Sequence, residues 1–234
     1  MTNFKKSLQA KFFITPKIPR KRLAGAWNFG VEIAFAMTAG RKVISQKKDW
    51  GTPQKYVDAV REVFDGVIHL DPCSSPFSLV KAKTEYMLPK VDGLSQFWNF
   101  PTIYVNLPYG NDAERGTRII DWIQKCEEAH RVFGSEVIAL VPVATNTAHW
   151  KDYIYNKATA VCFLYDTRLR FLVDGKDEGK GAPMSCAMVY WGKNYQRFFD
   201  VFIKHGAVLN LEPLRGKKIG FANGNGKVKN WNSR

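Results

Sequence analysis

The residues whose types and spacing best suit chemistry form the run Asn106-Leu107-Pro108-Tyr109, which follows the apolar segment 102–105. A residue that precedes proline is pushed towards an extended conformation, so Pro108 stiffens the turn. The side-chain oxygen of Asn106 and the backbone carbonyl of Leu107 could accept hydrogen bonds from both N–H groups of an exocyclic amine. The lone pair of such an amine is delocalised into its ring, and two acceptors help the nitrogen to become tetrahedral and attack a methyl sulfonium group.

The aromatic residue of this run, Tyr109, could stack on a base extruded from a duplex, as flipped bases commonly do on aromatic side chains. The same run also fits an Asx-turn that closes a strand, with Tyr109 buried in the core. Taken alone, the residue pattern favours neither interpretation.

A second run, Asp71-Pro72-Cys73-Ser74, also follows a predicted strand. Asp71 could bind an ammonium or hydroxyl group of a cofactor, and the small residues after it would allow that cofactor to come close. The alternative is a capping or turn role for Asp71, which the short run by itself favours. Ligands of open α/β sheets bind beyond the carboxyl ends of the strands, where both runs are expected to lie.

The sequence contains none of the short motifs that bind a dinucleotide, a nucleoside triphosphate through a Walker lysine, or zinc through H-E-x-x-H. Its four cysteines are far apart and form no C-x-x-C pair, which argues against a zinc site and a disulfide framework. The four histidines show no ligand spacing. We therefore predict no metal site, and free thiols in a reducing cytoplasm.

The elements that must position these two runs alternate between helices and strands. Thr52 is predicted to cap the first helix, with Pro53 at its first position. Hydrophobic periodicity predicts helices over 53–64, 114–131, 147–157 and 195–204, and strands over 67–70, 102–105, 136–141, 160–164, 185–191 and 207–211. This alternation predicts an α/β fold with a largely parallel sheet and helices on both faces.

The net charge of +14 is concentrated at the two ends of the chain. Residues 1–49 carry +9 and residues 215–234 carry +6, whereas residues 50–214 are almost neutral. We predict a basic N-terminal arm (1–49), a catalytic body (50–214) and a basic C-terminal tail (215–234). Basic ends suit a polyanion such as DNA, because contacts to phosphates supply affinity that does not depend on base sequence. Solubilising tails are the alternative.

Two groups of basic residues are candidates for contact with nucleic acid. Lys21 and Arg22 belong to the arm, and Arg168 and Arg170 belong to the charged segment 165–185. A solvated charged hairpin explains the second group equally well. No segment approaches the roughly 18 apolar residues that cross a bilayer, and no secretory pattern begins the sequence, so we expect a cytoplasmic protein without a membrane partner.

Over residues 50–191 the sequence resembles the phage-type DNA adenine N-methyltransferase family. The individual motifs are short, and their shared order along the chain makes the resemblance specific. The matching pieces are Trp50-Gly51-Thr52-Pro53, Leu70-Asp71-Pro72-Cys73-Ser74, Asp92-Gly93-Leu94, Val105-Asn106-Leu107-Pro108-Tyr109-Gly110, Trp122-Ile123-Gln124-Lys125, Leu140-Val141-Pro142, Arg168-Leu169-Arg170-Phe171, Gly181-Ala182-Pro183 and Val189-Tyr190-Trp191-Gly192.

The resemblance implies a Rossmann-like methyltransferase fold and site-specific methylation of adenine in DNA by S-adenosylmethionine, in the host cytoplasm if a phage encodes the protein. It implies that the run Asn106 to Tyr109 is the catalytic motif, although the family usually has proline where this chain has Leu107. It places Asp71 near the methionine part of the cofactor and Asp92 near its adenosine part. The remaining residues predicted to bind the cofactor are Thr52, Pro72, Cys73 and Ser74.

Three other functions fit parts of the same pattern. A cytosine N4-methyltransferase would share the fold but typically has serine in place of Asn106. An RNA methyltransferase would share the catalytic run. A DNA-binding protein that has lost catalysis would keep the basic ends, and the departure at Leu107 fits this possibility; it should not bind S-adenosylmethionine.

Overall fold

The computed structural model describes residues 35–38, 41–44, 50–166, 168–177, 179, 181–182, 184–217, 221–222 and 228–229. Lys21 and Arg22 lie outside these residues, so their predicted contact with DNA stays a prediction. Two short antiparallel pairs flank the body in sequence: β1 (Phe35–Thr38) with β2 (Arg41–Ile44), and β13 (Phe221–Ala222) with β14 (Val228–Lys229).

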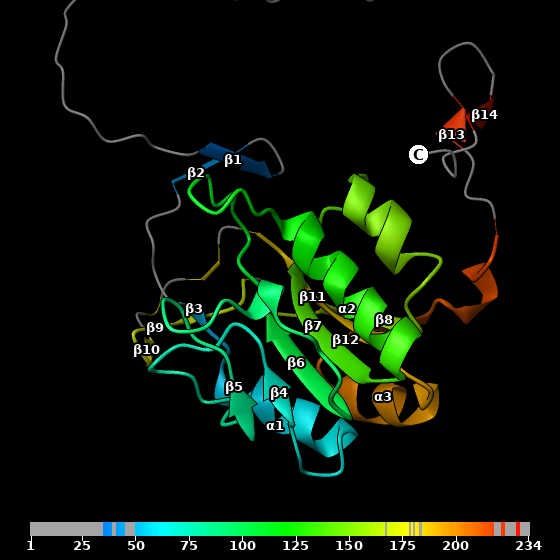
Figure 1. Cartoon of the computed structure of the whole chain (residues 1–234). Coiled ribbons are helices and arrows are strands. Elements are labelled where there is room, and N and C mark those ends of the chain that lie inside the picture. Colours follow the sequence, from blue (N-terminus) through cyan, green and yellow to red (C-terminus); the bar gives the residue numbers. More distant parts are fainter. Residues whose placement is uncertain are drawn as a thin grey trace, which may run out of the picture. The chain divides into compact units, whose positions relative to one another are not determined.

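A seven-stranded sheet in the order β12-β8-β11-β7-β6-β4-β5 forms the centre of the body (Figure 1). β4 pairs in parallel with β5 and β6, and β6 with β7, whereas β11 is antiparallel to β7 and β8, and β12 to β8. The strands are β4 (Leu70–Asp71), β5 (Thr84–Glu85), β6 (Thr102–Asn106), β7 (Glu136–Pro142), β8 (Ala160–Leu164), β11 (Cys186–Trp191) and β12 (Gly206–Asn210).

The sheet is therefore mixed. The prediction of a largely parallel sheet is confirmed for the half that contains β5, β4, β6 and β7, which carries both candidate runs. The other half is antiparallel because the chain returns after β8 and inserts β11 between β7 and β8. Hydrophobic periodicity shows that a strand is buried, but it carries no information on the direction of the neighbouring strand.

Helices cover both faces of the sheet, as predicted (Figure 1). α1 (Gln54–Val63) and α3 (Tyr195–Phe202) pack on one face, and α2 (Ile119–Phe133) packs on the other together with the π-helical turn Trp150–Ile154. Successive side chains of a strand point to opposite faces, so Ile138 of β7 packs beneath α1 and α3 while Ala139 packs beneath α2. Within the described residues, no helix is long and apolar enough to cross a membrane.

Several helix boundaries differ from the sequence prediction. The N-cap of α1 is Pro53 rather than Thr52, whose buried hydroxyl instead lies 2.7 Å from the hydroxyl of Tyr104. α2 begins at Ile119 rather than near 114, because the Asp121 carboxylate accepts a hydrogen bond from the backbone N–H of Arg118 and so starts the helix there. The helix predicted over 147–157 is a single π-helical turn.

A second, small sheet in the order β10-β9-β3 joins the start of the body to the segment between β8 and β11. β3 (Trp50–Gly51) is antiparallel to β9 (Leu172–Val173), which forms a hairpin with β10 (Lys176–Asp177). The two turn residues, Asp174 and Gly175, both have positive φ (49° and 79°), as the tight turn of a two-residue hairpin requires. The predicted charged segment 165–185 is thus partly a hairpin.

Candidate active site

The two candidate runs begin at the carboxyl ends of neighbouring parallel strands. Asp71 is the last residue of β4 and Asn106 is the last residue of β6, and these strands pair at Leu70 and Ile103. The thiol of Cys73 donates a hydrogen bond to the backbone carbonyl of Asn106, with a separation of 3.1 Å. The structure therefore brings the predicted catalytic and cofactor-binding runs into direct contact.

The side-chain amide of Asn106 has a defined orientation. Its Nδ2 donates a hydrogen bond to the backbone carbonyl of Trp50. A carbonyl oxygen only accepts hydrogen bonds, so the amide must present its nitrogen to Trp50 and its oxygen elsewhere. None of the described residues donates a hydrogen bond to Asn106 Oδ1, which leaves this acceptor available to an amine.

The next two residues of the run differ in exposure. The side chain of Leu107 is only 2% exposed and packs in the core beneath α2, whereas Pro108 is exposed. Packing of the Leu107 side chain in this core fixes the position of the turn. The Leu107 carbonyl belongs to the backbone and does not depend on the side chain at this position.

Tyr109 packs within an aromatic cluster that we define as Trp50, Tyr109 and Phe171. The ring of Tyr109 meets Trp50 and Phe171 edge-on, at centroid distances of 6.4 and 5.9 Å, while Trp50 and Phe171 stack on each other at 5.2 Å. Burial raises the pKa of the Tyr109 hydroxyl well above its usual value, so the phenol stays neutral. The residue as a whole is half-buried, so it both contributes to the core and keeps accessible surface.

Asp71 is a buried carboxylic acid with only 3% of its surface exposed. Its oxygens accept hydrogen bonds from the Cys73 backbone N–H (3.1 Å) and the Ser78 hydroxyl (3.4 Å). Burial raises the pKa of the Asp71 carboxyl to about 7, although the Cys73 N–H favours its charged form. A buried acid with so high a pKa is well suited to a positively charged ligand, which would stabilise the carboxylate.

The loop after Asp71 is packed closely against the segment that contains Asp92. A Cβ on Gly93 would lie 1.8 Å from the Pro72 carbonyl oxygen, so only glycine allows this approach. Beside Asp71, the Ser74 hydroxyl is buried and makes no hydrogen bond of normal geometry within the described residues. This hydroxyl still faces the Asp71 carboxyl and lowers its pKa, so the two side chains together offer a buried polar surface to a ligand.

Asp92 and Thr52, two further candidates for cofactor binding, already have partners. The Asp92 carboxylate caps the 3₁₀ turn Gly93–Ser95 by accepting from the Leu94 N–H, and it forms a 3.1 Å ion pair with Arg115. Its side chain is still 36% exposed, so a ligand can reach it. The hydroxyl of Thr52 is committed to Tyr104, and contact of Thr52 with a cofactor stays a prediction.

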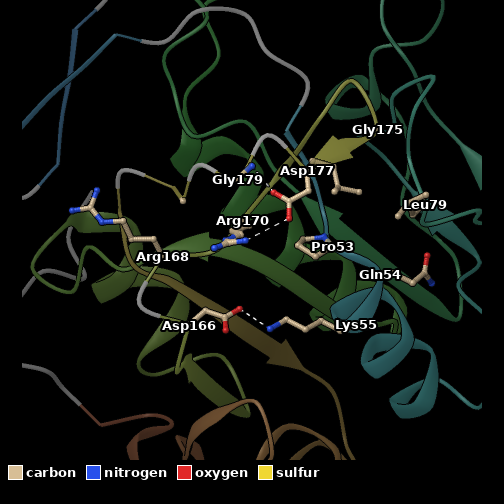
Figure 2. Close-up of a pocket in the computed structure, with 12 residues that line it drawn as sticks. Pro53, Gln54, Lys55, Leu79, Asp166, Arg168, Arg170, Gly175, Asp177 and Gly179 are labelled. Carbon is tan, nitrogen blue, oxygen red and sulfur yellow. Dashed lines mark hydrogen bonds and ion pairs between the residues drawn. The ribbon is translucent and has the colours of Figure 1, made fainter.

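Arg168 and Arg170 are exposed and line an open pocket of about 840 Å³ (Figure 2). Arg170 points towards Asp177 of β10, with 3.9 Å between the charged groups, and no described residue forms an ion pair with Arg168. The lining also includes Lys55, whose ammonium lies 2.7 Å from the carboxylate of Asp166. The pocket lining thus holds three basic and two acidic side chains, from the β8–β11 connection and the start of α1, and has a net positive charge.

The structure reveals four residues of the site to which the sequence assigned no role. Trp50 and Phe171 complete the aromatic cluster, and Arg115 pairs with Asp92. Glu85 ends β5 beside Asp71 and raises the pKa of that acid. Trp50 and Phe171 do stand within the short motifs that carry the family resemblance, which is the one signal that could have identified them.

The chain is similar to a known protein family over most of its length. A family model described as DNA N-6-adenine-methyltransferase (Dam) matches residues 40–214, which is well over half of the chain. The matched residues include both runs, the aromatic cluster and the pocket. A search of curated proteins found no match.

Proposed function

Because the chain belongs to the DNA N-6-adenine-methyltransferase (Dam) family, we propose that it transfers a methyl group from S-adenosylmethionine to the exocyclic N6 amine of adenine in DNA. The observation that carries this proposal is the orientation of the Asn106 amide, which is held by Trp50 so that Oδ1 remains an acceptor. The mixed sheet with helices on both faces is compatible with a Rossmann-like methyltransferase fold, and the cytoplasm is where such an enzyme would meet DNA.

The residues at the end of β4 fit the cofactor. S-adenosylmethionine, when bound, supplies a methyl group on a positively charged sulfur together with an ammonium group. We propose that Asp71 binds the ammonium, that the buried Ser74 hydroxyl and the backbone of Pro72 and Cys73 line the same site, and that Asp92 binds the adenosine part. A cation beside Asp71 would offset part of the cost of burying its carboxylate.

The catalytic run acts on the adenine. Asn106 Oδ1 and the Leu107 carbonyl accept the two N–H groups, so the N6 lone pair is released from the ring and points away from both acceptors. Bound S-adenosylmethionine would supply the methyl group to this nitrogen and keep the electron pair of the broken carbon–sulfur bond, and the amine would release one proton to solvent. Preorganised dipoles of this kind stabilise the charge that develops on the nitrogen. Tyr109 stacks on the extruded base.

Calorimetric titration with S-adenosylmethionine, followed by nucleoside analysis of DNA from expressing cells, tests the proposed function. We expect saturable cofactor binding and N6-methyladenine in the DNA. N4-methylcytosine would assign the same site to cytosine, and methylated RNA with unmodified DNA would assign it to RNA. DNA binding without cofactor binding would mean that the protein has lost catalysis.

Replacing Tyr109 by alanine should weaken capture of the flipped base by about 1–3 kcal/mol, the range for aromatic stacking in single-strand sites. The effect should appear in the KM for DNA, since the acceptors for the amine are retained. Tyr109→Phe is the matched control because it keeps the ring and removes only the hydroxyl. Thermal unfolding should accompany the kinetics, as Tyr109 also packs on Trp50 and Phe171. Equal KM values for the alanine and phenylalanine variants would exclude stacking.

Replacing Arg168 and Arg170 by alanine should weaken DNA binding to a similar degree for all sequences. Each lost phosphate contact should reduce the slope of log affinity against log salt concentration by about 1. Arg131→Ala is a suitable control, since this exposed arginine of α2 pairs with Glu127 on the opposite face of the sheet. Fluorescence anisotropy at several salt concentrations measures the slope. An unchanged slope in the double variant would exclude both arginines from the DNA interface.

A further inference from the structure

We propose that the small sheet β10-β9-β3 is a positioning element for Asn106, so that residues of the β9–β10 hairpin set the rate of methyl transfer without touching the adenine. This inference rests on the proposed function, because it concerns the same catalytic asparagine. Its starting observation is the hydrogen bond from Asn106 Nδ2 to the Trp50 carbonyl, which joins the end of β6 to β3.

The terminal torsion of an asparagine side chain is broad, so the backbone alone does not select which amide atom faces the substrate. In a rotated amide, the nitrogen would face the target amine, and two donors would then oppose each other. The Trp50 carbonyl prevents this rotation. The catalytic orientation of Asn106 therefore depends on the position of β3.

β3 is only two residues long, and it is held by the hairpin in two ways. Trp50 and Gly51 pair with Val173 and Leu172 of β9. The ring of Trp50 also stacks on Phe171, the residue directly before β9. A displacement of β9 would therefore move the Trp50 carbonyl away from Asn106.

The hairpin is itself anchored at its base and its tip. At the base, the Ala182 N–H donates to the Leu169 carbonyl at 2.7 Å, and both side chains are buried. At the tip, a Cβ on Gly175 would lie 3.3 Å from the Cβ of Phe77, in the loop that supplies Ser78 to Asp71. The hairpin thus reaches from the loop beside Asp71 to β3, whose Trp50 carbonyl accepts from Asn106. Its residue Asp177 lines the pocket together with Arg168 and Arg170 (Figure 2).

Two substitutions of Gly51 test the inference, because they add side chains of different size between β3 and β9. A Cβ on Gly51 would lie 3.4 Å from the Leu172 Cβ, an ordinary contact, so Gly51→Ala should leave β3 against β9. Gly51→Leu should push the two strands apart. We expect Gly51→Leu to lower the rate at saturating DNA and cofactor by about tenfold or more, as small displacements of catalytic groups do, while Gly51→Ala keeps the wild-type rate.

The turn of the hairpin provides a second, independent variant. Gly175 and Gly66 both have positive φ (79° and 88°), so alanine strains the backbone at either position. Gly66 lies between α1 and the amino end of β4, whereas the active site is at the carboxyl end of this strand, and a Cβ on Gly66 would contact nothing within 4 Å. We expect Gly175→Ala to lower the saturated rate and Gly66→Ala to leave it unchanged. If Gly51→Leu does not fold, the comparison of Gly175→Ala with Gly66→Ala tests the inference in its place.

The readout that separates positioning from general stability is the side-chain amide of Asn106 itself. Its proton resonances can be assigned in protein labelled with ¹⁵N-asparagine by their loss in Asn106→Ala. In Gly51→Leu and Gly175→Ala we expect these resonances to shift and to exchange faster with water, together with the lower rate. Variants that keep the resonances and the saturated rate, and raise only the KM for DNA, would overturn the inference. An active Asn106→Ala enzyme would instead overturn the proposed function, so the two failures are distinguishable.

Discussion

Asn106→Ala should lower the rate of methyl transfer by ~10²–10³, the typical loss when one preorganised hydrogen-bonding group is removed from an active site. The variant removes the only side-chain acceptor of the proposed pair and leaves the Leu107 carbonyl in place. Single-turnover methylation of DNA with radiolabelled S-adenosylmethionine measures the rate directly. Affinity for the cofactor should be unchanged, because the hydrogen bond between Asn106 and the loop after β4 uses the Asn106 backbone carbonyl, which alanine keeps.

Two further variants define the origin of this effect. Asn210→Ala is a control at the far edge of the sheet, where this side chain accepts a hydrogen bond from the Glu212 N–H, and it should keep full activity. Asn106→Asp keeps the shape of the side chain but cannot donate to the Trp50 carbonyl, so it should be nearly as inactive as alanine. If Asn106→Ala methylates DNA at the wild-type rate, the run Asn106 to Tyr109 is not the active site.

Asp71→Asn should weaken binding of S-adenosylmethionine by about 1.5–3 kcal/mol, the range for a hydrogen bond to a charged group. The pKa of about 7 adds a test by pH. The carboxylate binds a cation and the protonated acid does not, so wild-type affinity should rise between pH 6 and pH 8. Calorimetry should find no such rise for Asp71→Asn, which cannot titrate. A wild-type affinity that is flat over this range would exclude Asp71 as the ligand of the ammonium.

The stability of the cofactor-free protein should fall as the pH rises, whereas its affinity for the cofactor should rise. Because the folded pKa of Asp71 is raised from 3.8 to about 7, its contribution to stability is present at low pH and is lost as the pH rises through 7. An elevation of this size corresponds to about 4 kcal/mol. At pH 8, Asp71→Asn should therefore unfold at a higher temperature than the wild-type protein, while binding cofactor more weakly. Weaker binding in a more stable protein cannot come from damage to the fold.

Several features of this protein follow from its sequence alone. Apolar periodicity predicts α1, α3 and the strands β6, β7, β8 and β11 near their observed places, because the face of an element that is buried is encoded locally. The two runs at the ends of β4 and β6 are recognisable because each combines a strand-end Asp or Asn with a nearby proline and residue types that suit the proposed chemistry. Their order with the other motifs indicates the family.

The tertiary structure alone decided the direction of β11 and the orientation of Asn106. Both depend on partners distant in sequence: β11 pairs between β7 and β8, and the Asn106 amide bonds to Trp50. The acceptor at Trp50 is a backbone carbonyl, which every residue carries, so no side-chain pattern reveals it. The pairing of Asp92 with Arg115 is hidden for a related reason, because it forms only when the loop after Tyr109 packs against the 3₁₀ turn. Local patterns therefore identify the groups that can do the chemistry, whereas long-range hydrogen bonds determine how those groups are held.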